Sequence, residues 1–201
     1  GRALGTGRDR PGRPRVARRR AGTHTRLRRV AFRPVGDDIL ERYGVAAHAR
    51  LRPDKVAIVA RERRITYAEL DGAVSAMARV LRARGVGPDA RLGLALRNRP
   101  EWIMAALATA RLRSQVVPIP SGATPDEVEY FGTDGDAAFV LDEAGLPAFL
   151  AEVAAASTAP LEDAGPDYTP LRAYTSGTTG KPKAVLRPVS PAVQAIQGMV
   201  D

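Results

Sequence analysis

Short apolar segments alternate with helix-forming segments from residue 55 onward, and this order constrains the fold more than any other feature of the sequence. We expect strands at residues 55–60, 91–96, 115–119, 138–141 and 171–175. We expect helices that begin near residues 66, 100, 124, 147 and 190. Because strands that alternate with helices form right-handed βαβ units, the sequence predicts an α/β fold with a mostly parallel sheet.

Two of the expected helices begin with local capping signals. Thr66 and Glu69 have the spacing of a capping box, and so do Thr124 and Glu127. In this arrangement the threonine and glutamate side chains each satisfy a free backbone amide of the first helical turn. Gly85 is a natural stop for the first helix. The same helix carries one apolar stripe at three- and four-residue steps, formed by Leu70, Val74, Met77 and Leu81.

The next helix and strand each contain a proline. Pro100 stands near the start of the helix, where its missing amide proton costs nothing. Pro118 indicates that the strand at 115–119 ends there or lies at a sheet edge. We expect the helix to bury an apolar side formed by Trp102, Ile103, Ala106, Leu107 and Ala110.

The net charge of +9 is concentrated at the start of the chain. Residues 1–35 contain 12 Arg and one acid, whereas residues 36–201 contain 19 basic and 21 acidic residues. We therefore expect a disordered Arg-rich tail at 1–35 and a folded domain at 36–201. The tail could bind nucleic acid through guanidinium–phosphate contacts. Because Arg outnumbers Lys 28 to 3 in the whole chain, an uninformative leader is the favoured interpretation, and nucleic acid is not the expected partner.

Composition excludes several other kinds of site. The sequence contains no cysteine and two histidines, which excludes disulfide scaffolds and thiolate metal sites and argues against a histidine-rich one. No apolar segment approaches the roughly 20 residues that a membrane-spanning helix needs. No apolar signal core follows the basic start. We therefore expect a cytoplasmic protein without a membrane span.

Two acidic pairs and one histidine are weaker candidates for chemistry. Asp37–Asp38 and Asp142–Glu143 could bind a metal or transfer protons. Neither pair has further ligands at a supporting spacing, so solvated loop or capping residues are favoured. His48 lies near the end of an expected helix and is interpreted as a surface or half-buried histidine.

The segment Tyr174–Lys183 carries the strongest chemical signal. Gly177 and Gly180 permit close approach of the backbone to a ligand, and amides between them can form an anion-binding nest. Two of the three lysines of the chain lie here, at Lys181 and Lys183. Its hydroxyl donors are Ser176, Thr178 and Thr179. The segment predicts a loop that binds the phosphates of a nucleoside triphosphate, and the alternative is a polar surface turn.

This loop is not a Walker P-loop. That pattern requires a glycine five positions before the Gly-Lys pair and a hydroxyl residue after it. Thr175 and Pro182 occupy those two positions here. The phosphate-binding chemistry must therefore belong to a different kind of loop.

Tyr174–Lys183 resembles the signature loop of the adenylate-forming superfamily, which includes acyl-CoA synthetases, nonribosomal peptide adenylation domains and luciferases. The resemblance extends over about residues 45–188. Its upstream landmarks are Thr66-Tyr67-x-Glu69-Leu70, Gly85-Val86, Asn98-x-Pro100-Glu101 and Val117-Pro118. The resemblance implies the N-terminal part of the adenylate-forming fold.

The resemblance also implies a two-step reaction. A carboxylate attacks the α-phosphorus of ATP, and a thiol of coenzyme A or a carrier protein then takes the acyl group. The implied cofactors are ATP and Mg²⁺, with a Mg²⁺ contact through Thr178 or Thr179, and coenzyme A is the expected co-substrate. We favour an acyl-CoA synthetase of fatty acid metabolism. The implied nucleotide-binding residues are Thr175, Ser176, Gly177, Thr178, Thr179, Gly180, Lys181 and Lys183.

The sequence departs from the family pattern at three places. Ala184 replaces a usual glycine, Leu186-Arg187-Pro188 replaces a usual hydroxyl–histidine pair, and the stretch after Asp142 is shorter. The adenine-binding strand, the ribose-binding acid and the catalytic lysine of the family all lie downstream of this loop. We therefore expect an N-terminal fragment that has no catalytic residue, is inactive alone and takes the missing C-terminal part as a partner. The alternatives are a nucleic-acid-binding module and a catalytically silent partner protein.

Overall fold

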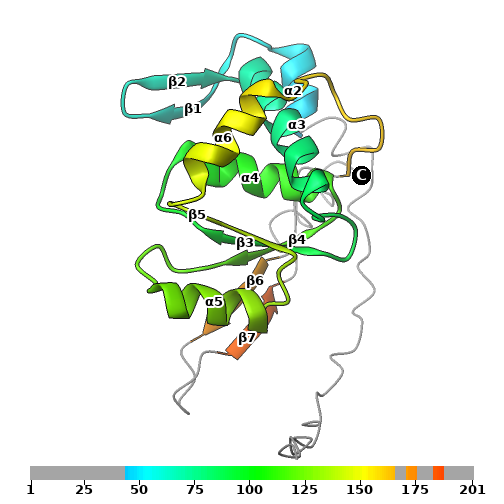
Figure 1. Ribbon diagram of the computed structural model, residues 1–201. Coiled ribbons are helices and arrows are strands. Elements are labelled where there is room, and N and C mark those ends of the chain that lie inside the picture. Colours follow the sequence, from blue (N-terminus) through cyan, green and yellow to red (C-terminus); the bar gives the residue numbers. More distant parts are fainter. Residues whose placement is uncertain (1–43, 166–170, 176–182, 188–201) are drawn as a thin grey trace, which may run out of the picture. The chain divides into compact units, whose positions relative to one another are not determined.

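The computed structural model describes residues 44–165, 171–175 and 183–187 (Figure 1). The described helices are α2 (Val45–Leu51), α3 (Tyr67–Ala83), α4 (Pro100–Arg111), α5 (Pro125–Asp134) and α6 (Leu146–Ala155). The described strands are β1 (Val56–Ala60), β2 (Arg63–Thr66), β3 (Arg91–Ala95), β4 (Gln115–Pro118), β5 (Phe139–Asp142), β6 (Leu171–Thr175) and β7 (Lys183–Arg187). Asp37–Asp38, the Arg-rich segment at 1–35 and the expected helix start at Ser190–Pro191 lie outside the described residues.

The main sheet has the strand order β5-β3-β4-β6-β7. The first four of these strands are parallel, and β7 runs antiparallel to β6. The α/β fold with a mostly parallel sheet is thus confirmed. Strand β7 was not expected, because its short segment of five residues has no alternation that distinguishes it from a loop.

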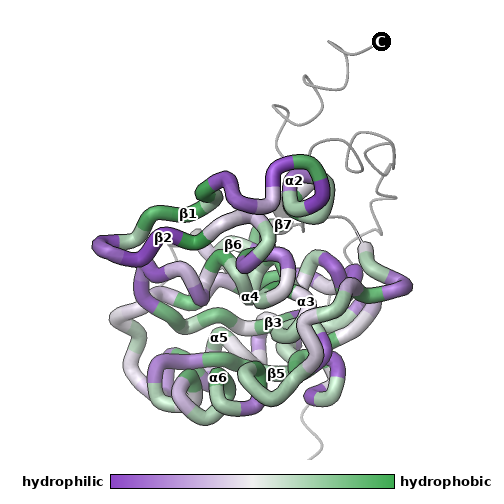
Figure 2. Tube along the Cα trace, turned by 90° about the horizontal axis from the view of Figure 1, so that it is seen from above, coloured by the Kyte–Doolittle hydropathy of each residue, from purple (hydrophilic) through white to green (hydrophobic). Residues whose placement is uncertain are grey.

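The strand expected at 55–60 is confirmed as β1, but it does not join the main sheet. It pairs with β2 in an antiparallel hairpin, in which Ala60 lies opposite Arg63. The two-residue turn contains Arg61 in the left-handed region, at φ 55°. The sequence offers neither of the usual turn signals, Asn-Gly or Asp-Gly, and the hairpin was therefore missed. Figure 2 shows hydrophobic β1 beside largely hydrophilic β2.

Helix α3 confirms the local signals at both of its ends. The Thr66 hydroxyl accepts a hydrogen bond from the Glu69 amide at 3.2 Å, and the Glu69 carboxylate accepts one from the Thr66 amide at 2.7 Å. Gly85 follows the helix in the left-handed region, at φ 84°. The predicted stripe is buried throughout and consists of Leu70, Val74, Met77 and Leu81. The second capping box, at the start of α5, is confirmed in the same way.

The alternation of side chains along the strands divides the core between the two faces of the sheet. On one face, Leu92, Leu94 and Val116 belong to a cluster with residues of α3, α4 and α6. On the other face, Ala95 and Val117 contact Phe131 of α5. Figure 1 shows α5 on the opposite side of the sheet from α3, α4 and α6. This layered arrangement leaves the carboxyl ends of the parallel strands at one edge.

The predicted buried side of α4 was wrong in part. Met104, Ala105 and Ala108 are buried in the core, whereas Ile103 is 41% exposed. Trp102, Ala106 and Leu107 are half-buried against the core, and Ala110 is buried as expected. This helix is apolar on most of its circumference, so periodicity alone does not select a side. The contact with α3 selects it.

Pro118 is the last residue of β4, which lies between β3 and β6. Of the two alternatives for this proline, the strand end is therefore confirmed and the sheet edge is excluded. Among the described residues, no helix is both long and apolar enough to cross a bilayer.

The connection from α6 to β6 returns along α3. The Arg79 guanidinium donates to the carbonyl oxygens of Ser157 and Ala159 at 2.9 and 2.7 Å. The amide of Gly165 donates to the Arg111 carbonyl at 2.7 Å. These contacts hold the returning chain on the helical layer before it enters β6.

Candidate functional site

The carboxyl ends of four parallel strands lie at one edge of the main sheet. They are Ala95 of β3, Pro118 of β4, Asp142 of β5 and Thr175 of β6. Ligands of open α/β sheets bind at this edge, because the strands end there and the following loops are free to form a site. The segment Tyr174–Lys183 begins there.

The β6–β7 hairpin determines where this segment starts and returns. Thr175 ends β6, Lys183 begins β7, and the two residues lie opposite each other in the antiparallel register. The structure thus brings the backbones of these two predicted site residues together. The other six predicted residues, Ser176, Gly177, Thr178, Thr179, Gly180 and Lys181, lie outside the described residues.

Tyr174 attaches the end of β6 to α5. Its hydroxyl donates a hydrogen bond to the carboxylate of Asp134 at 2.8 Å, and its ring centroid lies 4.8 Å from that of Phe131. Burial and the hydrogen bond to Asp134 raise the pKa of the Tyr174 phenol well above its usual value, so the phenol remains a donor. This pair could not be predicted from the sequence, because the two residues are 40 positions apart and no local pattern relates them.

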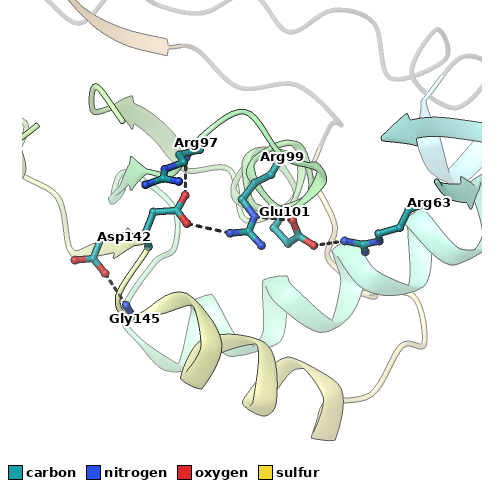
Figure 3. A network of polar contacts seen from close by, with 7 residues as sticks. Arg63, Arg97, Arg99, Glu101, Asp142 and Gly145 are labelled. Atoms are coloured by element: carbon teal, nitrogen blue, oxygen red, sulfur yellow. Dashed lines mark hydrogen bonds and ion pairs between the residues drawn. The ribbon is translucent and has the colours of Figure 1, made fainter. Parts of the chain in front are cut away.

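A network of charged side chains lies where β3 meets α4 (Figure 3). The Glu101 carboxylate accepts hydrogen bonds from Arg63 at 2.7 Å and from Arg99 at 2.9 Å. The carboxylate of Glu143 accepts from the Arg97 amide at 2.7 Å and from the Arg99 side chain at 3.0 Å. The network therefore ties β2, the β3–α4 connection and the β5–α6 connection together.

Glu101 is the buried member of this network, with a side chain that is 6% exposed. Burial favours the neutral carboxyl and would raise its pKa. The hydrogen bonds from Arg63 and Arg99 outweigh burial and lower the pKa of Glu101 to about 2. The group is therefore ionised at neutral pH and acts as a structural counterion, with no poised proton for acid–base chemistry.

The acidic pair Asp142–Glu143 divides between two roles. Asp142 is the last residue of β5, and its carboxylate accepts a hydrogen bond from the Gly145 amide at 2.7 Å, within the turn that leads to α6. Glu143 lies in the loop after β5 and is half-exposed, in keeping with the expected loop residue, and it is also a member of the charged network. No group of three or more potential metal ligands occurs among the described His, Asp and Glu residues. His48 is half-buried in α2, as expected, with its ring 4.8 Å from that of Tyr67.

Two hollows lie near these groups. One, of about 600 Å³, is lined by Ala95, Asp142 and residues of α5, and its charged lining is acidic. The other, of about 630 Å³, lies between the β1–β2 hairpin and the start of α4. Its basic lining consists of Arg61, Arg63, Arg97 and Arg99. Both hollows are large enough for part of a small molecule.

Comparison with known proteins relates this chain to a family of enzymes. A family model described as "AMP-binding enzyme" matches residues 45–200. Tyrocidine synthase 3 of Brevibacillus parabrevis is 34% identical over 165 residues, which is 74% of this chain and 2% of that protein. The chain thus spans a small part of this relative. The likeness to a tyrocidine synthase does not support the expectation of fatty acid metabolism.

Solved structures show the same fold. The AMPPNP-bound form of the nonribosomal peptide synthetase FmoA3 has a TM-score of 0.66 and 26% identity, and the match covers 79% of this chain and 18% of that one. O-succinylbenzoate coenzyme A synthetase of Bacillus subtilis, in complex with AMP, has a TM-score of 0.61 and 23% identity. That match covers 75% of this chain and 43% of the synthetase. At this identity the likeness shows the fold alone.

Proposed function

The chain belongs to the AMP-binding enzyme family, and on that premise we propose that it forms the triphosphate-binding part of an adenylate-forming ligase. In the proposed reaction a carboxylate oxygen attacks the α-phosphorus of ATP, and pyrophosphate leaves with the electron pair of the broken P–O bond. The observation that carries the proposal is the β6–β7 hairpin. In it the backbones of Thr175 and Lys183 lie opposite each other, at the edge where ligands of parallel α/β sheets generally bind, and this supports the proposal.

The chemistry of the loop residues suits this task. Backbone amides and hydroxyl groups can surround phosphate oxygens, and an ammonium group neutralises charge that develops on the leaving pyrophosphate. We assign this role to the loop residues Thr175, Ser176, Gly177, Thr178, Thr179, Gly180, Lys181 and Lys183. We assign no catalytic residue to the chain.

Magnesium fits the donors of the proposed loop. Mg²⁺ prefers hard oxygen ligands and is often held by few protein groups together with substrate phosphates. A hydroxyl of Thr178 or Thr179 is the proposed protein ligand. When bound, the ion would neutralise charge on the phosphates.

Residues 36–201 are the proposed partial AMP-binding domain, preceded by a basic tail at 1–35. We propose a cytoplasmic protein whose complete reaction needs the further C-terminal part of the family fold. The thiol acceptor has two candidates, coenzyme A and a carrier protein. The 34% identity to tyrocidine synthase 3 favours the carrier protein, and with it a carboxylate substrate other than a fatty acid.

Binding of AMPPNP in the presence of Mg²⁺ tests the loop assignment. Isothermal titration calorimetry on the full chain is expected to show binding that weakens at least 10-fold in Lys183→Ala and Thr178→Ala, because each removes a group to which the proposal assigns a phosphate contact. Lys55→Ala is the matched control, since this exposed lysine is the only one outside the loop. Equal affinity in the wild type and both loop variants, or no binding by the wild type, would contradict the proposal.

A further inference from the structure

The carboxyl half of β6 is held by side-chain contacts as well as by its neighbouring strands. The described register between β4 and β6 is the pair Val116–Leu171, at the first residue of β6. Thr175, where the proposed phosphate loop begins, lies four residues further on, or roughly 13 Å along an extended strand. The register pair with β4 thus lies at the far end of β6, and contacts near Thr175 add to the placement of the loop entrance.

Pairing with the antiparallel strand β7 does not by itself fix the position of Thr175. Tyr174 lies opposite Ala184, and Thr175 lies opposite Lys183. Strand β7, however, is the terminal strand of the described sheet, and Val185 on it is 45% exposed. Because β7 has no further strand partner in the described part of the chain, a displacement of β6 would carry β7 with it. The hairpin thus requires an attachment to another element.

Helix α5 provides this attachment. The Tyr174 hydroxyl donates to Asp134 at 2.8 Å, and the Tyr174 ring packs edge-on against Phe131 at 4.8 Å. The Arg172 guanidinium adds a hydrogen bond to the Gly135 carbonyl at 3.3 Å. All three contacts reach the last turn of α5 or the residue after it.

The end of α5 is itself firmly placed. Phe131 is buried at 6% exposure, and the helix approaches the sheet closely. A Cβ atom at Gly132 would lie 3.0 Å from the Val140 side chain, and one at Gly135 would lie 2.9 Å from that of Val117. Such short separations are possible only because both positions are glycine. The end of α5, which carries the acceptor Asp134, is therefore packed closely against the sheet.

We infer that Tyr174 is a positioning residue for the proposed phosphate loop, and that Asp134 acts through it. The phenol holds the carboxyl end of β6 against α5 and so determines the position from which Thr175 and the following residues approach the nucleotide. The inference rests on the proposed function of the loop.

Two measurements on the full chain test the inference. Tyr174→Phe keeps the ring and removes the hydroxyl, and Asp134→Ala removes the acceptor. In hydrogen exchange, a peptide that spans Thr175 and Lys183 is expected to exchange faster in both variants. The AMPPNP affinity in the presence of Mg²⁺ is expected to fall about 5- to 10-fold, since a hydrogen bond to a charged group is lost.

Three controls separate positioning from general destabilisation. The double variant is expected to match either single variant, because both remove the same contact. Asp134→Asn keeps an acceptor oxygen and is expected to retain most of the affinity. Tyr67→Phe, which alters a tyrosine of α3 packed against His48, is expected to change neither measurement.

The outcomes distinguish the inference from the proposed function. Unchanged exchange and affinity in Tyr174→Phe, while Lys183→Ala binds weakly, overturns the positioning role and leaves the loop assignment intact. Additive losses in the double variant overturn it as well. Wild-type affinity in Lys183→Ala and Thr178→Ala refutes the proposed function. In that case the hydrogen exchange of Tyr174→Phe still tests whether the Tyr174–Asp134 contact holds the end of β6. If Tyr174→Phe does not fold, Asp134→Ala tests the same contact, because removal of an exposed carboxylate is expected to leave the fold intact.

Discussion

Replacement of Glu101 by Gln tests how the charged network stabilises the fold. The substitution keeps the size of the side chain and removes its negative charge. Arg63, whose side chain is 60% exposed, can then be hydrated by water. Arg99 retains its second partner, Glu143. The loss therefore comes mainly from the carboxylate itself.

The magnitude follows from the pKa of Glu101, which is lowered from 4.5 to about 2. A difference of this size between the folded and unfolded chain stabilises the folded state by about 3 kcal/mol at neutral pH. Since the folded pKa is the lower one, this stabilisation is present above pH 4.5 and is lost as the pH falls toward 2. Because the two arginines keep other partners or water, we expect Glu101→Gln to lose about 2–3 kcal/mol at pH 7.

Urea denaturation followed by circular dichroism measures this loss. The difference in the free energy of unfolding between wild type and Glu101→Gln is expected to shrink to about 1 kcal/mol at pH 3, because the Glu101 carboxyl of the unfolded chain, with its ordinary pKa of 4.5, is then mostly protonated. Glu62→Gln, at an exposed turn position of the β1–β2 hairpin, is the matched control and is expected to change little. A loss below about 0.5 kcal/mol at pH 7, or a difference that stays constant between pH 7 and pH 3, would refute the reasoning.

Further predictions concern packing, capping and titration. Thr66→Ala is expected to cost about 1 kcal/mol of unfolding free energy, and Thr66→Ser to cost less, since serine retains the capping hydroxyl. Gly93→Ala is expected to cost about 1–3 kcal/mol, because its Cβ would lie 3.0 Å from the Val140 side chain. Phe149→Ala is expected to cost about 3–5 kcal/mol, because the ring is fully buried. Urea midpoints at pH 7 check all three. In a spectrophotometric titration, Tyr174 is expected to stay protonated where ordinary tyrosines ionise, since burial and Asp134 raise its pKa.

The part of the candidate site that could be predicted from the sequence consists of residues that are adjacent in the chain. Ten adjacent residues, from Tyr174 to Lys183, contain the glycines, hydroxyls and lysines of the proposed phosphate loop. The β6 strand before it was also predicted. The return strand β7, the Tyr174–Asp134 pair and the charged network around Glu101 were not, because each joins residues that are distant in the sequence.

The sequence by itself determined the α/β class and the starts of helices α3, α4, α5 and α6 to within a residue or two. Thr66 and Glu69 illustrate why: a capping box acts within four residues, so its energetics are complete in the local chain. The tertiary structure decided which strands pair and which helix side is buried. Helix α4 is apolar on most of its circumference, and its contacts with α3 and the sheet bury Met104 and Ala108 rather than Ile103. Pairing and burial depend on partners that folding brings together, and no local pattern of residues specifies those partners.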